Sequence, residues 1–196
     1  PQGCDVYRAN LAAFQDRLAR RLYGDVLVEL LGTATLDPLA RNGRLVGFLE
    51  ERGRLDDLGG WFAEALPFRG RSVICYHRDW TYFASLFGLN VVDFVEPKPG
   101  IPPTARHVAE LIERIEREDV KVLVSANYFE RSKPQLIADR TGITPVIVPM
   151  SVGGEPGIET YFDLVDLWIS RLGEAFALVE GGAGTTVAKH HDEPGR

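Results

Sequence analysis

Chemically useful side chains follow the first of four short apolar runs in the sequence. His77, with Arg78 and Asp79, comes directly after the run at residues 72–76. Imidazole is the commonest side-chain metal ligand and also the usual general base, so His77 is the best candidate for chemistry in this chain. A histidine that only caps a strand and bonds a backbone carbonyl would occupy the same place, and position alone favours neither interpretation.

The four runs have the length and β-branched composition of buried parallel strands. They lie at residues 72–76, 90–95, 121–125 and 145–148. Stretches with helical periodicity separate them, at residues 80–87, 104–117 and 133–140. This alternation predicts an α/β fold: a parallel sheet of about four strands, with right-handed crossovers and helices on both faces. In such sheets ligands bind at the carboxyl ends of the strands, where His77, Glu96, Asn127 and Ser151 are expected.

A helical region precedes this sheet. From Asp5 to Leu22 apolar residues recur in steps of three and four, which predicts one amphipathic helix. Its apolar stripe consists of Tyr7, Leu11, Phe14, Leu18 and Leu22. Between Gly24 and Leu66 glycines and Pro38 interrupt several shorter helical segments, and no run there predicts a strand.

The sequence therefore divides into three parts. Residues 1–69 predict the helical region, residues 70–180 the α/β region, and residues 181–196 a flexible tail. The last helix is expected from about Gly157 to Phe176. His190 and His191 lie in the tail, without the rigid frame that a metal site needs.

Composition excludes several classes of protein. The chain has 22 Lys and Arg against 28 Asp and Glu, a net charge of -6, so it lacks the basic field that nucleic acid requires and we expect no such partner. No apolar run approaches the length of a membrane span.

Cys4 and Cys75 are too few for a disulfide framework, and Cys75, inside an apolar run, is expected to be a small buried residue. The GxSxG and HExxH signatures of hydrolases are also absent.

Three segments together carry a specific pattern: Tyr76 to Phe83, Phe87 to Leu89, and Glu96 to Pro103. A histidine is followed after two residues by an aromatic residue and after two more by Phe, and Phe-Gly-Leu comes next. This pattern resembles the zinc- and manganese-binding solute-binding proteins of ABC transporters, the cluster A-I metal receptor family. Tyr7 to Phe14 and Ile137 to Gly142 are similar to the same family. The resemblance extends over most of residues 5–177 and is weak between Gly24 and Leu58.

The resemblance implies a binding protein and no catalysis. In such receptors two α/β lobes, joined by a long rigid helix, hold one transition metal between them. Residues 70–180 then correspond to the C-terminal lobe, and the helix within residues 1–69 to the linker. His77 falls on the family's third metal ligand, with zinc or manganese as the transported ligand. The implied partner is an ABC permease in the membrane.

The resemblance also implies a periplasmic or extracellular surface location. Nothing near Pro1 has the order of a signal peptide, so such a signal would lie upstream of this residue.

The family's ligand pattern is incomplete here. Its first two ligand histidines lie upstream of the segment that matches Tyr7 to Phe14, so an N-terminal lobe or its equivalent is required. Its fourth ligand, often Asp, falls at Met150, and a carboxylate that is common after the third strand falls at Ala126. One histidine holds zinc only weakly, because each absent ligand leaves the ion with water.

Other side chains are candidates to complete or support the site. Glu155 and Glu159, near Met150, are candidate substitute ligands, although glutamates in such loops are mostly solvated. Asp79 or Asn127 could orient the His77 ring by accepting its other N–H.

Several functions stay open at this point. The leading one is the C-terminal lobe of an extracytoplasmic zinc or manganese receptor, in a chain that is either a fragment or a naturally short relative. A degenerate, metal-free relative would act as an interaction module, and a contiguous apolar patch at the sheet end would favour it. A small α/β enzyme would use His77 as base with Asp79 or Glu96 nearby, and residues 151–154 as an anion holder.

Overall fold

Glycines divide the first part of the chain into a long helix and several short ones, as expected. The computed structural model describes residues 3–98 and 100–182. Its first elements are α1 (Cys4–Tyr23), α2 (Asp25–Leu31), α3 (Thr33–Arg41), α4 (Leu45–Glu50), η1 (Leu55–Asp57), α5 (Gly60–Ala65) and η2 (Leu66–Phe68). Gly24 and Gly32 end α1 and α2 with φ values of 82° and 69°, which glycine adopts without a steric penalty.

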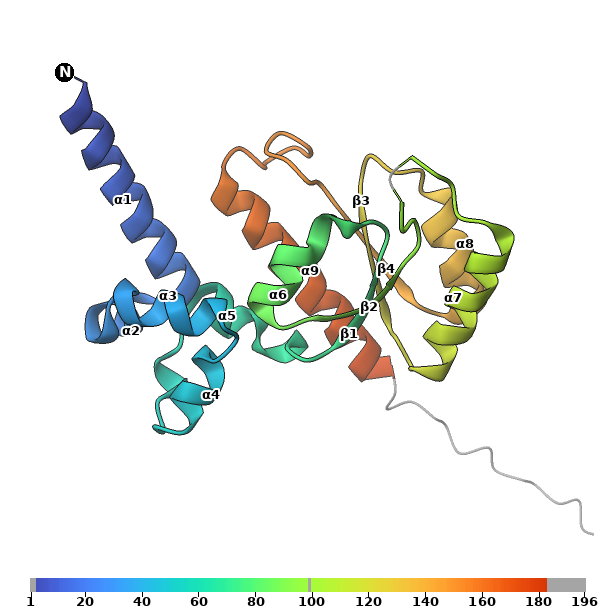
Figure 1. Cartoon of the computed structure of the whole chain (residues 1–196), viewed down its shortest axis with the longest axis horizontal. Helices are drawn as coiled ribbons and strands as arrows, with labels where there is room; N and C mark the ends of the chain where they lie inside the picture. The colour runs from blue at the N-terminus through green and yellow to red at the C-terminus, as the bar shows by residue number, and fades with distance from the viewer. Residues whose placement is uncertain (1–2, 99, 183–196) are drawn as a thin grey trace, which may run out of the picture.

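The first half of α1 extends away from the rest of the molecule (Figure 1). Leu18 and Leu22, at the end of the predicted stripe, pack against the core. The other three stripe residues, Tyr7, Leu11 and Phe14, are 76%, 56% and 45% exposed. The periodicity therefore predicted the helix correctly, but among the described residues Tyr7 and Leu11 are mostly exposed and Phe14 is covered only in part, by Phe162.

Four parallel strands form the sheet, in the order β2-β1-β3-β4. They are β1 (Ser72–Cys75), β2 (Asn90–Phe94), β3 (Val122–Ala126) and β4 (Thr144–Val148). The crossovers pass through η3 (Arg78–Trp80) with α6 (Thr81–Phe87), through α7 (Ala105–Arg117) and through α8 (Ser132–Thr141). The chain thus moves from β1 to one side, then returns across it to β3 and β4. This reversal makes the carboxyl ends of β1 and β3 a topological switch point, where open α/β sheets bind ligands.

Alternate residues of the central strands face two separate cores. Val73 and Cys75 pack with the helical region and with α9 (Tyr161–Gly182). Ile74 and Tyr76 face the opposite side, where α7 and α8 cover the sheet (Figure 1). The predicted α/β fold with helices on both faces is therefore confirmed, and strands buried on both sides explain the continuous apolar runs. Cys75 is 1% exposed, as expected for a small buried residue, and burial raises the pKa of its thiol to about 12.

Capping side chains set the helix ends that the sequence placed only approximately. The Thr104 hydroxyl accepts the backbone N–H of His107, so Thr104 is the N-cap of α7, which begins at Ala105. The last helix begins at Tyr161 instead of Gly157, because Thr160 and Asp163 accept each other's backbone N–H in a reciprocal cap. It continues to Gly182, two residues into the range for which we expected a tail. The rest of that range, with His190 and His191, lies outside the described residues.

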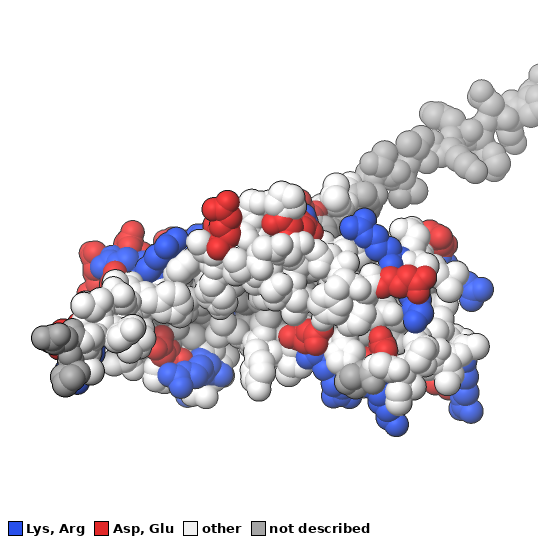
Figure 2. All heavy atoms as spheres, turned by 90° about the horizontal axis from the view of Figure 1, so that it is seen from above, with Lys and Arg blue, Asp and Glu red and all other residues white. Residues whose placement is uncertain are grey.

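The surface carries charges of both signs. Figure 2 shows Lys and Arg interspersed with Asp and Glu, and the described residues on that face form no broad area of one charge. Within residues 3–98 and 100–182, no helix is long and apolar enough to cross a membrane.

We predict that Gly60→Ala destabilises the protein strongly. Gly60 has a φ of 57°, and a Cβ there would overlap the backbone carbonyl oxygen of Arg21 in α1. The left-handed backbone conformation costs an alanine about 1 kcal/mol. The backbone must also shift to remove the overlap, so the free energy of unfolding should fall by about 2 kcal/mol or more in total. Gly43→Ala is the matched control, because Gly43 has a φ of 67° but open space around its Cβ position. Urea denaturation of both variants measures the difference, and equal losses would contradict this explanation.

Candidate metal centre at the carboxyl end of the sheet

His77 stands at the end of the central strand β1. The preceding residue, Tyr76, continues the pairing with β3, since its N–H donates to the Val124 carbonyl at 2.7 Å. His77 itself has extended backbone and begins the turn of η3. Its side chain is 14% exposed, so the ring is largely held by its neighbours and still reaches the surface.

Asp79 fixes one side of the His77 ring. The carboxylate Oδ1 lies 3.2 Å from His77 Nδ1. Because a carboxylate only accepts, the Nδ1 position carries the proton and Nε2 keeps its lone pair. A histidine ligand oriented by a carboxylate on its other nitrogen is the usual arrangement in metal sites. The geometry is therefore the one that we expected Asp79 to supply, and its effect on a metal stays a prediction.

Tyr128 holds the same carboxylate from the neighbouring strand. Its hydroxyl donates to Asp79 Oδ2 at 3.0 Å. Burial and the hydrogen bond to Asp79 raise the pKa of Tyr128 to about 12, so the hydroxyl keeps its proton at neutral pH. The adjacent Phe129 ring stacks on His77 at 6.1 Å and packs against Tyr76 at 4.4 Å. The ends of β1 and β3 are thus joined by a chain of hydrogen bonds and by aromatic contacts.

Asn127 contacts a different part of the site than expected. Its backbone N–H donates to the Val148 carbonyl and its side-chain amide donates to the Gly154 carbonyl at 2.9 Å. These bonds tie the end of β3 to the loop after β4. That Asn127 orients the His77 ring stays a prediction. Among the described contacts, Asp79 is the side chain that bonds to this ring.

Arg171 of α9 anchors the loop after β4. Its guanidinium makes a bidentate ion pair with Glu155, at 3.0 and 2.6 Å, and also donates to the Ile147 carbonyl at 2.7 Å. This pairing lowers the pKa of the Glu155 carboxyl. Both oxygens of Glu155 are therefore engaged, and Glu155 would have to leave Arg171 to bind a metal.

The remaining candidate positions do not gather around His77. Glu159 is exposed, Ala126 is buried at the end of β3, and Met150 packs partly into the core beside α9. No group of three or more His, Cys, Asp or Glu side chains within the described part of the chain could hold a metal ion. Among the described residues, His77 is thus an imidazole oriented by Asp79 without a cluster of further ligands around it.

The other polar candidates have structural partners. His107 Nε2 lies 2.9 Å from the Phe94 carbonyl, as expected of a half-buried histidine outside a metal site. Glu96 is 8% exposed, and its N–H extends the pairing of β2 with β1 by donating to the Tyr76 carbonyl. His77 does lie within reach of a carboxylate, Asp79, as the enzyme alternative required.

Comparison with protein families decides between these interpretations. Residues 50–175, more than half of the chain, match the family described as ZnuA, zinc-uptake complex component A, periplasmic. The chain belongs to this family. ZnuA-family proteins are metal-binding receptors and not enzymes, so the enzyme alternative is not supported, and neither is the metal-free module.

Solved structures with a related fold include other metal-binding proteins. They include the solute-binding protein FpvC of Pseudomonas aeruginosa in complex with Mn²⁺ (22% identity, TM-score 0.48, covering 79% of this chain and 57% of that one). A crystal structure of ZnuA gives 21% identity and a TM-score of 0.48, covering 76% of this chain and 52% of that one. The laminin-binding protein Lmb of Streptococcus agalactiae gives 18% identity and a TM-score of 0.49, covering 72% of this chain and 55% of that one. The chain thus spans little more than half the length of these structures, and no curated protein matches it.

Sequence reasoning missed two of the residues that build the site. They are Tyr128 and Arg171, neither of which the sequence pattern singles out. Their partners Asp79 and Glu155 are distant in sequence, so only the strand order and the packing of α9 reveal them.

We predict that Asp79→Asn lowers the pKa of Tyr128. Burial is the main cause that raises this pKa, and the hydrogen bond to Asp79 and its negative charge raise it further, so loss of the anionic acceptor should lower it toward the usual value near 10. NMR of ¹³C-labelled tyrosine at about pH 11 measures the ionised fraction of Tyr128, which should rise in the variant. Asp56→Asn, an exposed change in η1, should leave it unaltered. An unaltered fraction in Asp79→Asn would contradict the hydrogen bond.

We predict that Glu155→Gln destabilises the protein by about 1 kcal/mol at neutral pH, as expected for a partly exposed bidentate ion pair. The folded-state pKa of Glu155 lies below its unfolded value, so the pair stabilises fully above the unfolded pKa and is lost as pH falls through the folded one. The difference in the free energy of unfolding should therefore vanish in acid. Glu159→Gln, in the same loop, is the control and should show no such pH dependence. A Glu155→Gln deficit that persists in acid would show that charge is not its cause.

Proposed function

We propose that this chain is the C-terminal lobe of an extracytoplasmic zinc or manganese receptor that delivers its metal to an ABC permease. In this proposal residues 70–180 correspond to the lobe, and the helical region before residue 70 contains the linker helix α1. The observation that carries the proposal is His77, held by Asp79 at the switch point of the sheet, in a chain of the ZnuA family.

The His77 ring is prepared for a metal. With Nδ1 bonded to Asp79, Nε2 is the nitrogen available to the ion. A neutral imidazole is a good ligand for zinc and also binds manganese, so this ligand does not select between them. The other ligands come from an N-terminal lobe that closes over the end of the sheet, with Glu159 as the candidate from this chain whose carboxylate is exposed.

The exposed apolar surface of α1 supports a second lobe. Tyr7 and Leu11 are exposed, and they belong to the first half of α1, which extends away from the rest of the molecule (Figure 1). Phe14 is exposed in part, and its ring contacts Phe162 of α9. Near the base of α1, a mainly aromatic cavity of about 400 Å³ opens between α1, α6 and α9, and Asp79 also lines it. A lobe seated on α1 would cover both surfaces and bring its ligands close to His77. The periplasm or the extracellular surface is the matching location.

We predict that His77→Ala weakens zinc binding by the longest natural form of the protein about 100-fold or more, because the ion loses a ligand held in place before binding. Asp79→Asn should weaken it about 10- to 100-fold, because it removes the group that orients the ring. His107→Gln is the matched control, since it removes an imidazole whose ring is already bonded to the Phe94 carbonyl, and the glutamine amide can still donate to that carbonyl. Isothermal titration calorimetry measures the dissociation constants.

The same titration on this chain alone tests whether further ligands from outside the chain are needed for tight zinc binding. We expect weak binding that still depends on His77. The proposal would be overturned if His77→Ala left zinc binding by the long form unchanged, or if the long form bound no zinc.

A further inference from the structure

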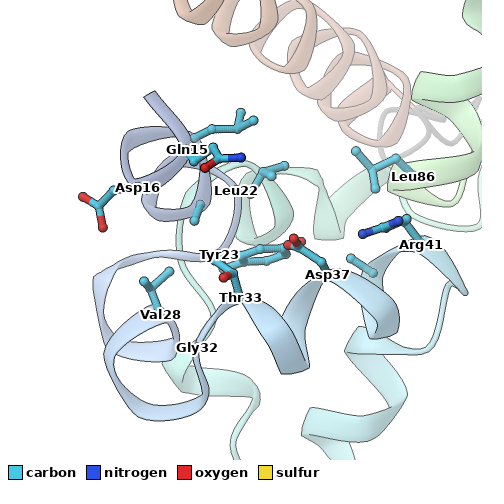
Figure 3. Close-up of a pocket in the computed structure, with 13 residues that line it drawn as sticks. Gln15, Asp16, Leu22, Tyr23, Val28, Gly32, Thr33, Asp37, Arg41 and Leu86 are labelled. Atoms are coloured by element: carbon cyan, nitrogen blue, oxygen red, sulfur yellow. The ribbon is translucent and has the colours of Figure 1, made fainter. Parts of the chain in front are cut away.

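A second cavity lies in the helical region, away from the sheet end. It has a volume of about 680 Å³ and is enclosed by α1, α3 and Leu86 of α6 (Figure 3). Cavities of this size hold small molecules in other proteins. Apart from Leu86, every residue that lines it precedes residue 50, where the match to the ZnuA family begins. The cavity is therefore not part of the proposed metal site.

One face of α3 supplies three polar side chains of this cavity. Gln15 and Asp16 of α1 also line it, and Asp16 accepts a hydrogen bond from Arg20. Thr33, Asp37 and Arg41 are spaced by four residues, so their side chains follow one another along the same side of the helix. Figure 3 shows Asp37 and Arg41 together at the cavity, with Leu86 across from them. The helix thus presents one carboxylate and one guanidinium to the same space.

Neither charge is neutralised by another side chain of the described residues. No ion pair within residues 3–98 and 100–182 includes Asp37 or Arg41. Asp37 is nevertheless fixed, because the buried Tyr23 hydroxyl donates to its Oδ1 at 2.9 Å. Burial and Asp37 raise the pKa of Tyr23 far above its usual range, so this donor stays protonated. The second oxygen of Asp37 remains available to a ligand.

The wall between α1 and α3 is apolar. Leu22, Val28, Ala40 and Leu86 line it, beside the charged pair. A ligand that fits must combine a positive group for Asp37, a negative group for Arg41 and an apolar body for this wall. The two charges must also lie close together, because residues four apart on a helix have Cβ atoms only about 6 Å apart.

We propose that this cavity binds a free, apolar α-amino acid as a zwitterion. Its ammonium bonds to Asp37 Oδ2, its carboxylate bonds to Arg41, and its side chain packs on Leu22 and Leu86. The proposal goes beyond the metal-receptor function and uses neither His77 nor Asp79, although Leu22 and Leu86 also line the neighbouring cavity beside Asp79.

NMR titration of the chain with L-leucine tests the proposal. We expect saturable shifts of the α3 amides. Leucinamide, which lacks the carboxylate, and N-acetyl-leucine, which lacks the ammonium, should each bind at least tenfold more weakly, since each loses a charged hydrogen bond. Equal binding of the three compounds, or no saturable binding of leucine, would overturn the proposal.

Variants assign the contacts. Asp37→Asn keeps an acceptor for Tyr23, and Arg41→Gln changes an exposed side chain, so both variants are expected to fold. Each should weaken leucine binding at least tenfold, whereas Arg44→Gln, which removes an exposed charge outside the cavity, should not. Leucine binding that is unchanged in Asp37→Asn and Arg41→Gln would place the ligand elsewhere and refute the site. Zinc affinity should not change in these variants, so the outcome is independent of the metal proposal.

Discussion

Asp79 accepts a hydrogen bond from His77 on its own strand end and another from Tyr128 on the neighbouring one. The bond from Tyr128 exists only because β1 and β3 lie side by side and parallel, with their carboxyl ends at the same edge. A change of register or strand order would separate Tyr128 from Asp79 and leave the carboxylate free to rotate. The orientation of the imidazole thus depends on the pairing of the two central strands, which are also the most deeply buried part of the sheet. A rigid scaffold under a surface ligand is what a preorganised metal site requires.

The helical region is joined to this scaffold by a common core. Tyr23, Leu36 and Trp61 belong to the same apolar cluster as Val73 and Val124. Close backbone approach at Gly24 and Gly59 brings α1 against α5, and Trp61 at the start of α5 donates to Asp166 of α9. The base of α1 is therefore fixed relative to the sheet, while its first half is exposed. A helix anchored at one end is suited to hold a second lobe at a defined distance from His77.

Much of the fold was predictable because its signals are local. Strand runs such as residues 72–76, the helix stripe in α7 and the cap at Thr104 each depend on neighbours within a few residues. The site was predictable only in part. Ligands bind at the carboxyl ends of parallel strands, and this position selected His77 together with Asp79, two residues further along the chain. Tyr128, Glu155 and Arg171 could not be assigned their partners, because those contacts arise when β3, the loop after β4 and α9 pack together. The periodicity of α1 likewise could not tell which half of its stripe is covered.

The two proposed sites use different means to place their polar groups. At the sheet edge, groups from two strands converge, so their geometry is set by long-range pairing and supported by the packing of Phe129 on Tyr76. In the helical region, the spacing of Thr33, Asp37 and Arg41 on one helix places them together without any long-range contact. Only Tyr23, reaching across from α1, fixes Asp37 against the core. The family match covers the first proposed site and begins beyond α3, so the proposed metal site lies within the part of the chain that matches the family. The cavity rests on a segment outside that match, and a ligand there would distinguish this chain from other receptors built on the same sheet.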